Sequence, residues 1–408
     1  MKLRAPHLIG IGLLVLGIVA VLVVQLTGLG RAGGTGFGGL TEVRGVVGSE
    51  KAEFFQDPAV REVFAEHGYE VNVSKSGSWR MATLEGVTDH DFAFPASEIA
   101  AQNIAKTHPD AVVSQHKPFF SPLAVATFEP IVELLAANGV ASKDAQGRWQ
   151  IDMAAYLELV DDDVRWNQLT GAAGVYDSPR SVMITSTDIR TSNSAGMYLA
   201  LSAYVLNGNS VIASTAEADA NLSLLTKLFV AQGYAGASST APFDDYLSQG
   251  MGAVPMVFVY EGQFLEEQLK ERSRIRDGMV LAYPSPTIFS VHTGVAFSEE
   301  GREVMELLET DPRLADLLAE HGFRPQGQNA AAFDEFLERE QLADVYPSAT
   351  TFVNLAQEPS YEMLDYLLGR IGEAYEVSGA PPVVIETTPE PVDENGDGTD
   401  DQPDGGTP

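Results

Sequence analysis

Hydroxyl and amide side chains gather in one loop between two apolar runs of the sequence. Residues 181–185 (SVMIT) have the pattern of a short strand, and residues 195–206 carry apolar side chains at helical spacing. The loop between them ends in Thr191, Ser192, Asn193 and Ser194. Each of these side chains can cap the helix by accepting a hydrogen bond from an N–H group of its first turn. The same N–H groups and the helix dipole also attract anions, so the loop is either a capped helix start or part of a ligand site.

The same arrangement recurs three times near the start of the chain. Strand-like residues 42–48 lead into Ser49, residues 69–73 lead into the run Ser74 to Ser78, and residues 91–94 lead through Pro95 into Ser97 and a helix over 98–104. Right-handed crossovers leave such loops on one side of a parallel sheet. We therefore expect three hydroxyl-rich helix starts at one sheet edge.

Composition excludes several classes of function. The chain has 408 residues, with 57 Asp and Glu against 25 Lys and Arg, and a net charge of −32. This excess of negative charge argues against nucleic acid, whose phosphates it would repel. The absence of cysteine excludes disulfides, thiolate metal sites, a cysteine nucleophile and a lipid-attachment cysteine.

The sequence shows no assembled catalytic set. Its seven histidines are scattered, and the motifs HExxH, GxSxG and GxxxxGK[ST] are missing. Asp89, His90 and Asp91 are adjacent, but neighbouring strand residues point to opposite faces and cannot all converge on one atom. The acidic run 161–163 is typical of a solvated turn. We therefore predict no catalytic residue, no metal and no cofactor, and a binding protein instead of an enzyme.

The pattern predicts an α/β protein with two lobes. About eight strands fall into two clusters of strand–loop–helix units, separated by a central helical segment. The predicted domain covers residues 42–375, with one lobe over about 42–125 and a return near 279–325, and the other over about 126–278. Because ligands of such folds lie outside the carboxyl ends of the strands, the expected site is the cleft between the lobes.

The ends of the chain differ from this body. Residues 8–29 are almost entirely apolar and long enough to cross a bilayer, and Lys2 and Arg4 precede them. We expect a single-pass anchor over residues 1–30 with the bulk of the chain outside the cell; the alternative is a signal segment cleaved near Ala32. Residues 31–41 are a glycine-rich linker, and the acidic, proline-rich residues 376–408 have the composition of a disordered tail.

In their order and in their residues, the segments resemble those of type II periplasmic or extracellular solute-binding proteins, the group that includes phosphate, molybdate and sulfate receptors. The resemblance covers about residues 43–325. It rests on VRGVVGSEKAEFF, YEVNVSKSGSWRMA, DFAFPAS, ITSTDIRTSNSAGMYLALSAYVL, VPMVFVYEGQF, MVLAYPSPT and LAEHGFRP. It implies the two-lobed type II fold with a ligand cleft between the lobes.

The resemblance also implies which residues grip the ligand. They are turns after the early strands, the hydroxyl loop of the second lobe and the end of a later strand: Gly48, Ser49, Glu50, Ser76, Gly77, Ser78, Ser97, Thr191, Ser192, Asn193, Ser194, Tyr260 and Glu261. A small oxyanion suits the hydroxyls and helix N-termini, with Arg80 or Arg190 as the neutralising charge. Glu50 and Glu261 instead suit a neutral polar or amine-bearing solute.

These observations predict an extracellular, membrane-anchored solute-binding protein that captures a small polar or anionic ligand. The expected partner is the permease of an ABC-type importer. The alternative is an extracellular ligand sensor or assembly partner on the same fold, because a fold does not fix a function. A hydrolase is the least favoured of the three.

Overall fold

The computed structural model describes residues 39–232, 239–378 and 390–391. The chain divides into two compact units, Met1–Thr41 and Glu42–Pro408, and the fold below is that of the second unit. The predicted anchor over residues 8–29 and nearly all of the acidic tail lie outside the described residues. Within the described ranges, no helix is both long and apolar enough to span a membrane.

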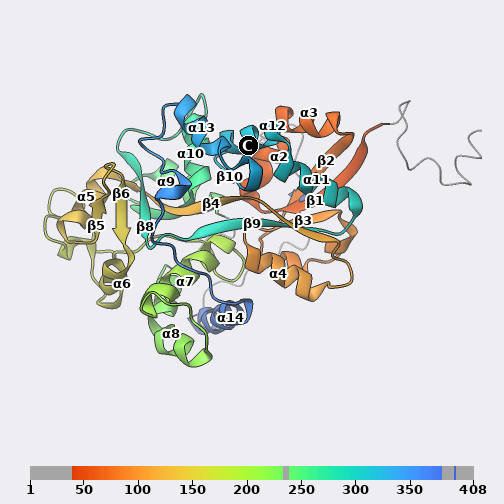
Figure 1. The fold of residues 1–408 in the computed structure, drawn as a ribbon. Coiled ribbons are helices and arrows are strands. Elements are labelled where there is room, and N and C mark those ends of the chain that lie inside the picture. Colours follow the sequence, from red (N-terminus) through yellow and green to blue (C-terminus); the bar gives the residue numbers. More distant parts are fainter. Residues whose placement is uncertain (1–38, 233–238, 379–389, 392–408) are drawn as a thin grey trace, which may run out of the picture. The chain divides into compact units, whose positions relative to one another are not determined.

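The second unit is built around one mixed β-sheet (Figure 1). Its strands run in the order β11-β2-β1-β3-β9-β4-β8-β6-β5, and β7 and β10 also pair with β4. The first half of this order contains β11 (Glu390–Pro391), β2 (Tyr69–Lys75), β1 (Thr41–Val47), β3 (Phe92–Phe94) and β9 (Phe289–Ala296). β1 and β3 are parallel, whereas β3 and β9 are antiparallel.

The long strand β4 (Ser114–Phe128) joins two lobes. Up to Pro122 it pairs with β9, and from Leu123 onward it pairs with β7 (Met256–Tyr260) and β8 (Met279–Ser285). We call the part built on β1, β2, β3 and β9 the first lobe. The second lobe is built on β7, β8, β6 (Trp149–Asp152) and β5 (Ala141–Lys143), and the two-residue strand β10 (Arg324–Pro325) pairs with the first half of β4.

Helices cover both lobes. Those of the first lobe are α2 (Ala52–Gln56), α3 (Pro58–Glu66), α4 (Glu98–Thr107), α11 (Glu299–Thr310) and α12 (Pro312–Glu320). The others are α5 (Glu129–Ala137), α6 (Met153–Asp161), α7 (Asn193–Leu206), α8 (Thr215–Val230), α9 (Thr240–Gln249), α10 (Glu261–Leu269), α13 (Ala332–Arg339) and α14 (Tyr361–Ser378). The hydrophobic core of the second lobe includes α7, with Ala195 and Leu199 fully buried, whereas the first lobe has its own phenylalanine-rich core around Phe54 and Phe92.

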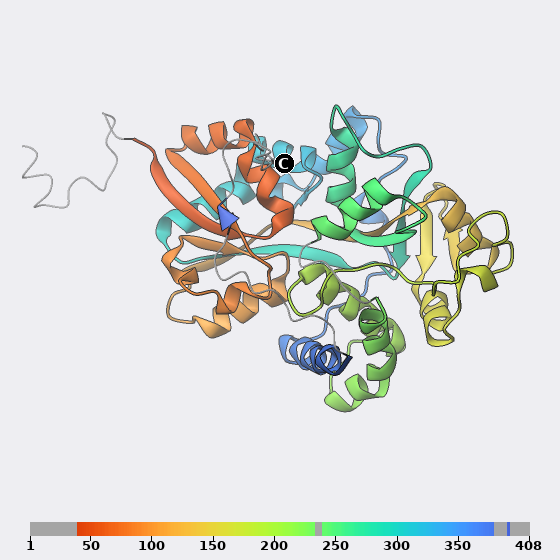
Figure 2. The same ribbon diagram turned by 180° about the vertical axis from the view of Figure 1, so that it is seen from behind.

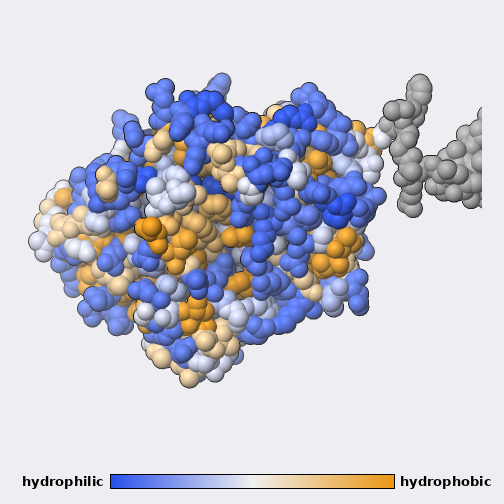
Figure 3. Space-filling view, viewed as in Figure 1, coloured by the Kyte–Doolittle hydropathy of each residue, from blue (hydrophilic) through white to orange (hydrophobic). Residues whose placement is uncertain are grey.

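The last described helix, α14, lies beside α8 and also contacts α4 and α7 (Figures 1 and 2). Leu364, Leu367 and Ile371 bury its inner face in the core of the second lobe. The segment between α13 and α14 crosses the face of the sheet that Figure 1 shows, and apolar surface is visible on this face in Figure 3. Val353, on this segment, is 94% exposed. The segment between α13 and α14 therefore runs over the surface before α14 packs against the core of the second lobe.

The α/β class is confirmed, and so are the helices that begin near Glu98 and Asn193. The expectation of a parallel sheet was wrong, because β9 enters the sheet between β3 and β4 and runs antiparallel to both. Ser114 and residues 123–126 belong to the single strand β4, where a bulge between His116 and Phe119 accommodates Pro118.

Two further local predictions were wrong. Residues 181–185 form isolated bridges instead of a strand, because only Ser181 and Thr185 find partners, in Arg165 and Val257. After the run Ser74 to Ser78, where we expected a helix start, the chain forms only a short 3₁₀ turn, Met81–Thr83. In both places most apolar side chains are buried, which the pattern detects, but the backbone follows tertiary contacts that the pattern does not show.

Candidate functional site

The N-termini of helices α4 and α7, one from each lobe, meet at a direct hydrogen bond. Ser97 is the N-cap of α4, and its Oγ both accepts a bond from Ala100 N at 3.3 Å and donates to Asn193 Oδ1 at 2.7 Å. Asn193 is the first residue of α7. Both side chains are buried. Two positive helix ends therefore point to one place between the lobes.

Helix α7 lacks the side-chain cap that most helix starts have. Its N-cap residue is Ser192, yet the Ser192 side chain makes no capping hydrogen bond, and its Oγ lies 3.1 Å from Ser194 Oγ instead. By contrast, Ser214 caps α8 by accepting a bond from Glu217 N at 3.3 Å. Ser192 and Ser194 are both buried, so the N-terminus of α7, whose first N–H groups have no acceptor within the helix, lies away from solvent.

Tyr260 extends the junction from the end of β7. Its hydroxyl accepts a hydrogen bond from Asn193 Nδ2 at 3.2 Å and also hydrogen-bonds with Ser290 on β9. Burial, followed by the nearby Glu50, raises the pKa of Tyr260 well above its ordinary value, so the hydroxyl keeps its proton. Ser97, Asn193 and Tyr260 thus form one connected polar network drawn from α4, α7 and β7.

The loop after β2 lies against the same junction. Ser78 is buried and accepts a hydrogen bond from Ala96 N at 3.0 Å, which ties this loop to the one that carries Ser97. Ser76 is half-buried, and its Oγ donates a weak bond to Gly77 O at 3.5 Å. Gly77 lies against the second lobe, where a β-carbon on it would sit 2.7 Å from Thr191 O.

Trp79 follows this loop and packs on the start of α7. A β-carbon on Gly196 would lie 2.9 Å from Trp79 Nε1, so the glycine makes room for the indole. The indole ring stacks on Tyr361 of α14, with the ring centroids 6.4 Å apart. Its buried Nε1 makes no hydrogen bond to any described residue. The three elements that meet here are the loop after β2, α7 and α14.

The loop after β1 contributes an ion pair. Glu50 pairs with the fully buried Lys51, whose Nζ also lies 3.1 Å from His292 Nδ1. Burial lowers the pKa of Lys51, an effect that Glu50 opposes, and burial together with Lys51 lowers the pKa of His292 well below its ordinary value. Gly48 is buried at the end of β1, and Ser49 begins the short turn that carries this pair. Glu50 is therefore neutralised from within its own loop, so it does not by itself exclude an anionic ligand.

Glu261 lies in a different network from the junction. Its carboxylate accepts hydrogen bonds from Arg324 Nε at 2.7 Å, from Arg324 Nη2 at 3.0 Å and from Tyr283 OH at 2.5 Å. Both members of this ion pair are buried. Such a closed set of bonds is typical of a structural ion pair.

Arg190, predicted as a neutralising charge, is bound to Asp188 through Nε at 2.9 Å and Nη2 at 2.5 Å. The hydroxyls of Thr187 and Ser194 are 2.8 Å apart, and Thr191 Oγ1 bonds weakly to Asp188 O at 3.5 Å. The loop before α7 is therefore braced by its own side chains. The positive charge closest in sequence to the α7 N-terminus is already paired.

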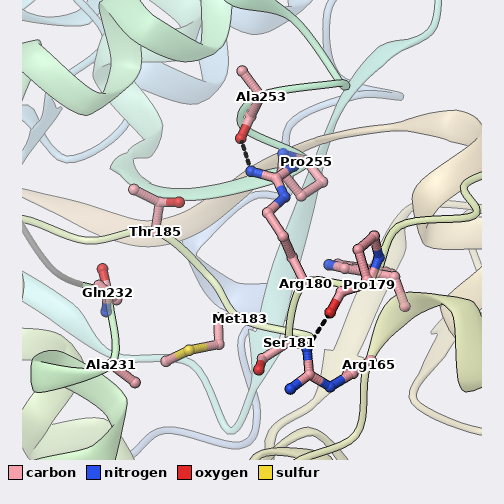
Figure 4. Close-up of a pocket in the computed structure, with 11 residues that line it drawn as sticks. Arg165, Pro179, Arg180, Ser181, Met183, Thr185, Ala231, Gln232, Ala253 and Pro255 are labelled. Carbon is pink, nitrogen blue, oxygen red and sulfur yellow. Dashed lines mark hydrogen bonds between the residues drawn. The ribbon is translucent and has the colours of Figure 1, made fainter.

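A cavity of 530 Å³ lies elsewhere in the second lobe (Figure 4). In its wall, Arg180 Nη1 donates to Ala253 O at 2.6 Å and Arg165 donates to Pro179 O. Gln232, also in the wall, accepts a bond from Ser186 N at 2.7 Å. None of the thirteen predicted site residues lines this cavity, so it is separate from the junction.

The structure brings together residues from all four predicted loops. Asn193 hydrogen-bonds to both Ser97 and Tyr260. Ser78 and Gly77 connect the loop after β2, and Glu50 acts electrostatically on Tyr260. Sequence reasoning missed Ser290 and Lys51. Lys51 follows the predicted Glu50, so its proximity to the site was visible in the sequence, whereas Ser290 comes from β9, a strand that was not predicted. Within the described ranges, no group of three or more His, Asp or Glu side chains is arranged to hold a metal ion.

Solved structures show what this arrangement resembles. The sulfate-binding protein SubI of Mycobacterium tuberculosis is 16% identical, with a TM-score of 0.50 over 80% of this chain and 96% of that one. The apo ferric ion-binding protein A of Pasteurella haemolytica is 10% identical, with a TM-score of 0.51 over 84% and 99%. AfuA of Actinobacillus pleuropneumoniae, solved with fructose 6-phosphate, is 11% identical, with a TM-score of 0.51 over 85% and 100%.

At the level of sequence, no family model and no curated protein matches the chain. The structural neighbours agree in architecture across nearly their whole lengths, and they are binding proteins. The mixed sheet, the shared strand β4 and the meeting of helix N-termini between two lobes fit the same architecture. The chain has the two-lobed α/β fold of the type II periplasmic solute-binding proteins.

Proposed function

We propose that this protein captures a small polar or anionic solute between its lobes, at the junction of Ser97, Asn193 and Tyr260. The observation that carries the proposal is the buried N-terminus of α7, which its N-cap residue Ser192 does not cap and which meets the N-terminus of α4. Two helix dipoles and a ring of hydroxyl and amide donors favour a ligand rich in acceptor oxygens. In the structure, these donors and acceptors bond to each other across the lobes.

An oxyanion fits the charges around the junction best. Glu50 is neutralised by Lys51, and Glu261 is neutralised by Arg324, so the two acids that favoured an amine-bearing ligand are already paired. Two similar folds are described as a sulfate-binding protein and as a protein bound to fructose 6-phosphate, and both ligands carry tetrahedral oxyanions. This likeness of fold supports the ligand class without identifying the ligand.

The proposal extends to the setting of the protein. Residues 8–29 would anchor the chain in the cell membrane with its bulk outside, and the captured solute would pass to the permease of an ABC-type importer. Intact mass measurement of the protein isolated from membranes tests the anchor: the N-terminal segment should be present, and a mature N-terminus near Ala32 would contradict it. An extracellular sensor on the same fold would bind the solute but support no uptake.

Binding is tested on the purified full-length chain. Native mass spectrometry should detect a co-purifying small solute, and calorimetry with sulfate, inorganic phosphate and fructose 6-phosphate should give saturable binding by at least one of them. Ser142→Ala, a substitution at an exposed serine, is a control that should leave binding unchanged. No co-purifying solute and no binding of any of these oxyanions would contradict the proposed function.

A further inference from the structure

Residues 354–356, far in sequence from the predicted site residues, pair with the connection between the lobes. Thr287 lies between β8 and β9, where the chain passes from the second lobe back to the first. Its N–H donates to Asn354 O at 2.9 Å, and its carbonyl accepts from Ala356 N at 2.8 Å. These two bonds fix the segment that precedes α14 at this connection. Glu358 follows two residues later.

Glu358 is half-buried, and one oxygen of its carboxyl group is fully enclosed and incompletely bonded. Its Oε2 is out of contact with solvent and has no hydrogen-bond partner among the described residues. It interacts electrostatically with Glu98, the first residue of α4, and with Tyr260 at the end of β7. Tyr260 belongs to the polar network of the site, and Glu98 follows Ser97, another member, so the Glu358 carboxyl group lies close to that network.

The groups around Glu358 favour its neutral form. Glu98 from α4 is acidic, although its carboxylate also pairs with Lys117 of β4 at 2.8 Å. Tyr260 from β7 keeps its proton, and Glu50 beyond Tyr260 is paired with Lys51. Burial, and then Glu98, raises the pKa of Glu358 to about 8. A neutral carboxylic acid has an O–H donor, whereas its ionised form can only accept. At neutral pH the side chain therefore offers a proton donor.

We propose that Glu358 is a ligand-binding residue of the interlobe site and that its carboxylic acid O–H donates a hydrogen bond to the bound oxyanion. This inference rests on the proposed function and deepens it. An oxyanion would satisfy the buried oxygen that has no partner, and its negative charge would keep Glu358 protonated. Once Glu358 ionises, its charge repels the ligand, so binding of an oxyanion weakens as the pH rises above about 8.

Sulfate is the probe of choice, because its charge stays constant between pH 6 and pH 9 and any pH dependence then belongs to the protein. Calorimetry on the full-length chain should show a dissociation constant that is level near pH 6 and rises toward tenfold per pH unit above pH 8. In Glu358→Gln, whose amide keeps an N–H donor but cannot ionise, the affinity should stay near the pH 6 value throughout. Glu358→Ala, which lacks the donor, should bind roughly 10- to 100-fold more weakly at pH 6. Glu373→Gln, an exposed change on α14, should behave like the unaltered protein.

Three results would overturn the inference while leaving the proposed function standing. They are sulfate binding with a flat pH profile, a pH profile unchanged in Glu358→Gln, and affinity that rises above pH 8 and loses this rise in Glu358→Gln. The third would show that the carboxylate accepts a cationic group. If neither sulfate, phosphate nor fructose 6-phosphate binds at any pH, the proposed function fails and the inference fails with it.

Discussion

Gly77 and Thr191 touch across the two lobes through backbone atoms alone. A β-carbon on Gly77 would lie 2.7 Å from the carbonyl oxygen of Thr191, a distance that real side chains essentially never show. The loop after β2 and the loop before α7 are therefore as close as their backbones allow. Only a glycine permits this degree of closure over the N-terminus of α7.

Replacing Gly77 with alanine should hold the lobes apart. The methyl group meets a backbone oxygen instead of a flexible side chain, so one of the two loops must move. We expect oxyanion affinity to fall by about 5- to 100-fold, which corresponds to the roughly 1–3 kcal/mol cost of overpacking. Calorimetry measures the affinity, and small-angle scattering should show a larger radius for the variant with ligand present. Gly369→Ala on α14, where an added β-carbon meets nothing, is the matched control and should bind normally.

Removing two hydroxyls should weaken binding without unfolding the protein. Ser76 makes one weak bond, and Ser192 bonds to Ser194 Oγ instead of capping its helix, so we expect the fold to tolerate the loss of both hydroxyls. Each hydrogen bond lost to a ligand costs about 0.5–1.5 kcal/mol, so Ser76→Ala combined with Ser192→Ala should reduce affinity roughly tenfold or more. Calorimetry measures the affinity, and thermal unfolding of the same preparation measures the stability. Unchanged affinity, or a large drop in melting temperature without ligand, would show that these serines serve the structure.

The sequence allowed the loops of the site to be predicted, because polar residues between a strand-like run and a helical run are a local pattern. Ser97 and Asn193 lie 96 residues apart, yet each was recognisable as a helix start, and the structure joins them. Ser290 and Glu358 have no such local signal. They reach the site through β9 and through the segment bonded to Thr287, and both depend on long-range backbone pairing.

The charge that the site presents to a ligand could not be predicted from the sequence either. In the sequence, Glu50 and Glu261 are equivalent acids beside the predicted cleft. Whether each one presents a negative charge to the ligand depends on the cation that pairs with it in the fold. Lys51 is adjacent in sequence to Glu50, whereas Arg324 is 63 residues from Glu261. Sheet direction was mispredicted for a similar reason, since the antiparallel strand β9 comes from a distant part of the chain.

Stability should depend on pH through Glu358. Its folded pKa of about 8 lies above the ordinary 4.5, so between these values the folded state holds a proton that the unfolded state has lost. The free energy of unfolding should therefore decrease as the pH rises through this window, by at most roughly 1.4 kcal/mol per pH unit from this group. In Glu358→Gln this contribution disappears. Urea unfolding of both proteins at pH 6 and pH 8 checks it, and an equal pH dependence in the two would contradict the raised pKa.

Breaking the Glu261–Arg324 pair should damage the fold instead of the ligand site. Glu261→Gln leaves the buried guanidinium of Arg324 without its counter-charge, which typically costs about 3–5 kcal/mol of folding free energy. Affinity of the remaining folded protein for sulfate should stay within a factor of two or so, since Glu261 belongs to a separate network. The exposed pair Glu320–Arg339 supplies the control, because Glu320→Gln should barely change stability. A stable Glu261→Gln variant with lost binding would return Glu261 to the ligand site.

Helix α14 should slow the release of ligand, because it holds both lobes. Toward the second lobe it packs on α8, where Tyr366 OH donates to Asp219 at 2.8 Å. Toward the first lobe, Tyr361 stacks on Trp79 and lies under the ammonium group of Lys106, with Nζ 4.8 Å from the ring centroid. Opening the lobes would separate these aromatic contacts, which are each worth about 0.5–1.5 kcal/mol.

Tyr361→Ala should therefore raise the dissociation rate of a bound oxyanion by about 2- to 10-fold, with a smaller effect on the association rate. Tyr366→Ala is a matched control on the same helix, because its hydrogen bond stays on the side of the second lobe and does not cross between lobes. Stopped-flow measurement of tryptophan fluorescence follows the exchange, since Trp79 lies at the contact. Equal dissociation rates for Tyr361→Ala and the unaltered protein would show that α14 moves with the second lobe and does not hold the first. A faster rate in both tyrosine variants would instead show that α14 acts through its overall packing and not through the contact with Trp79.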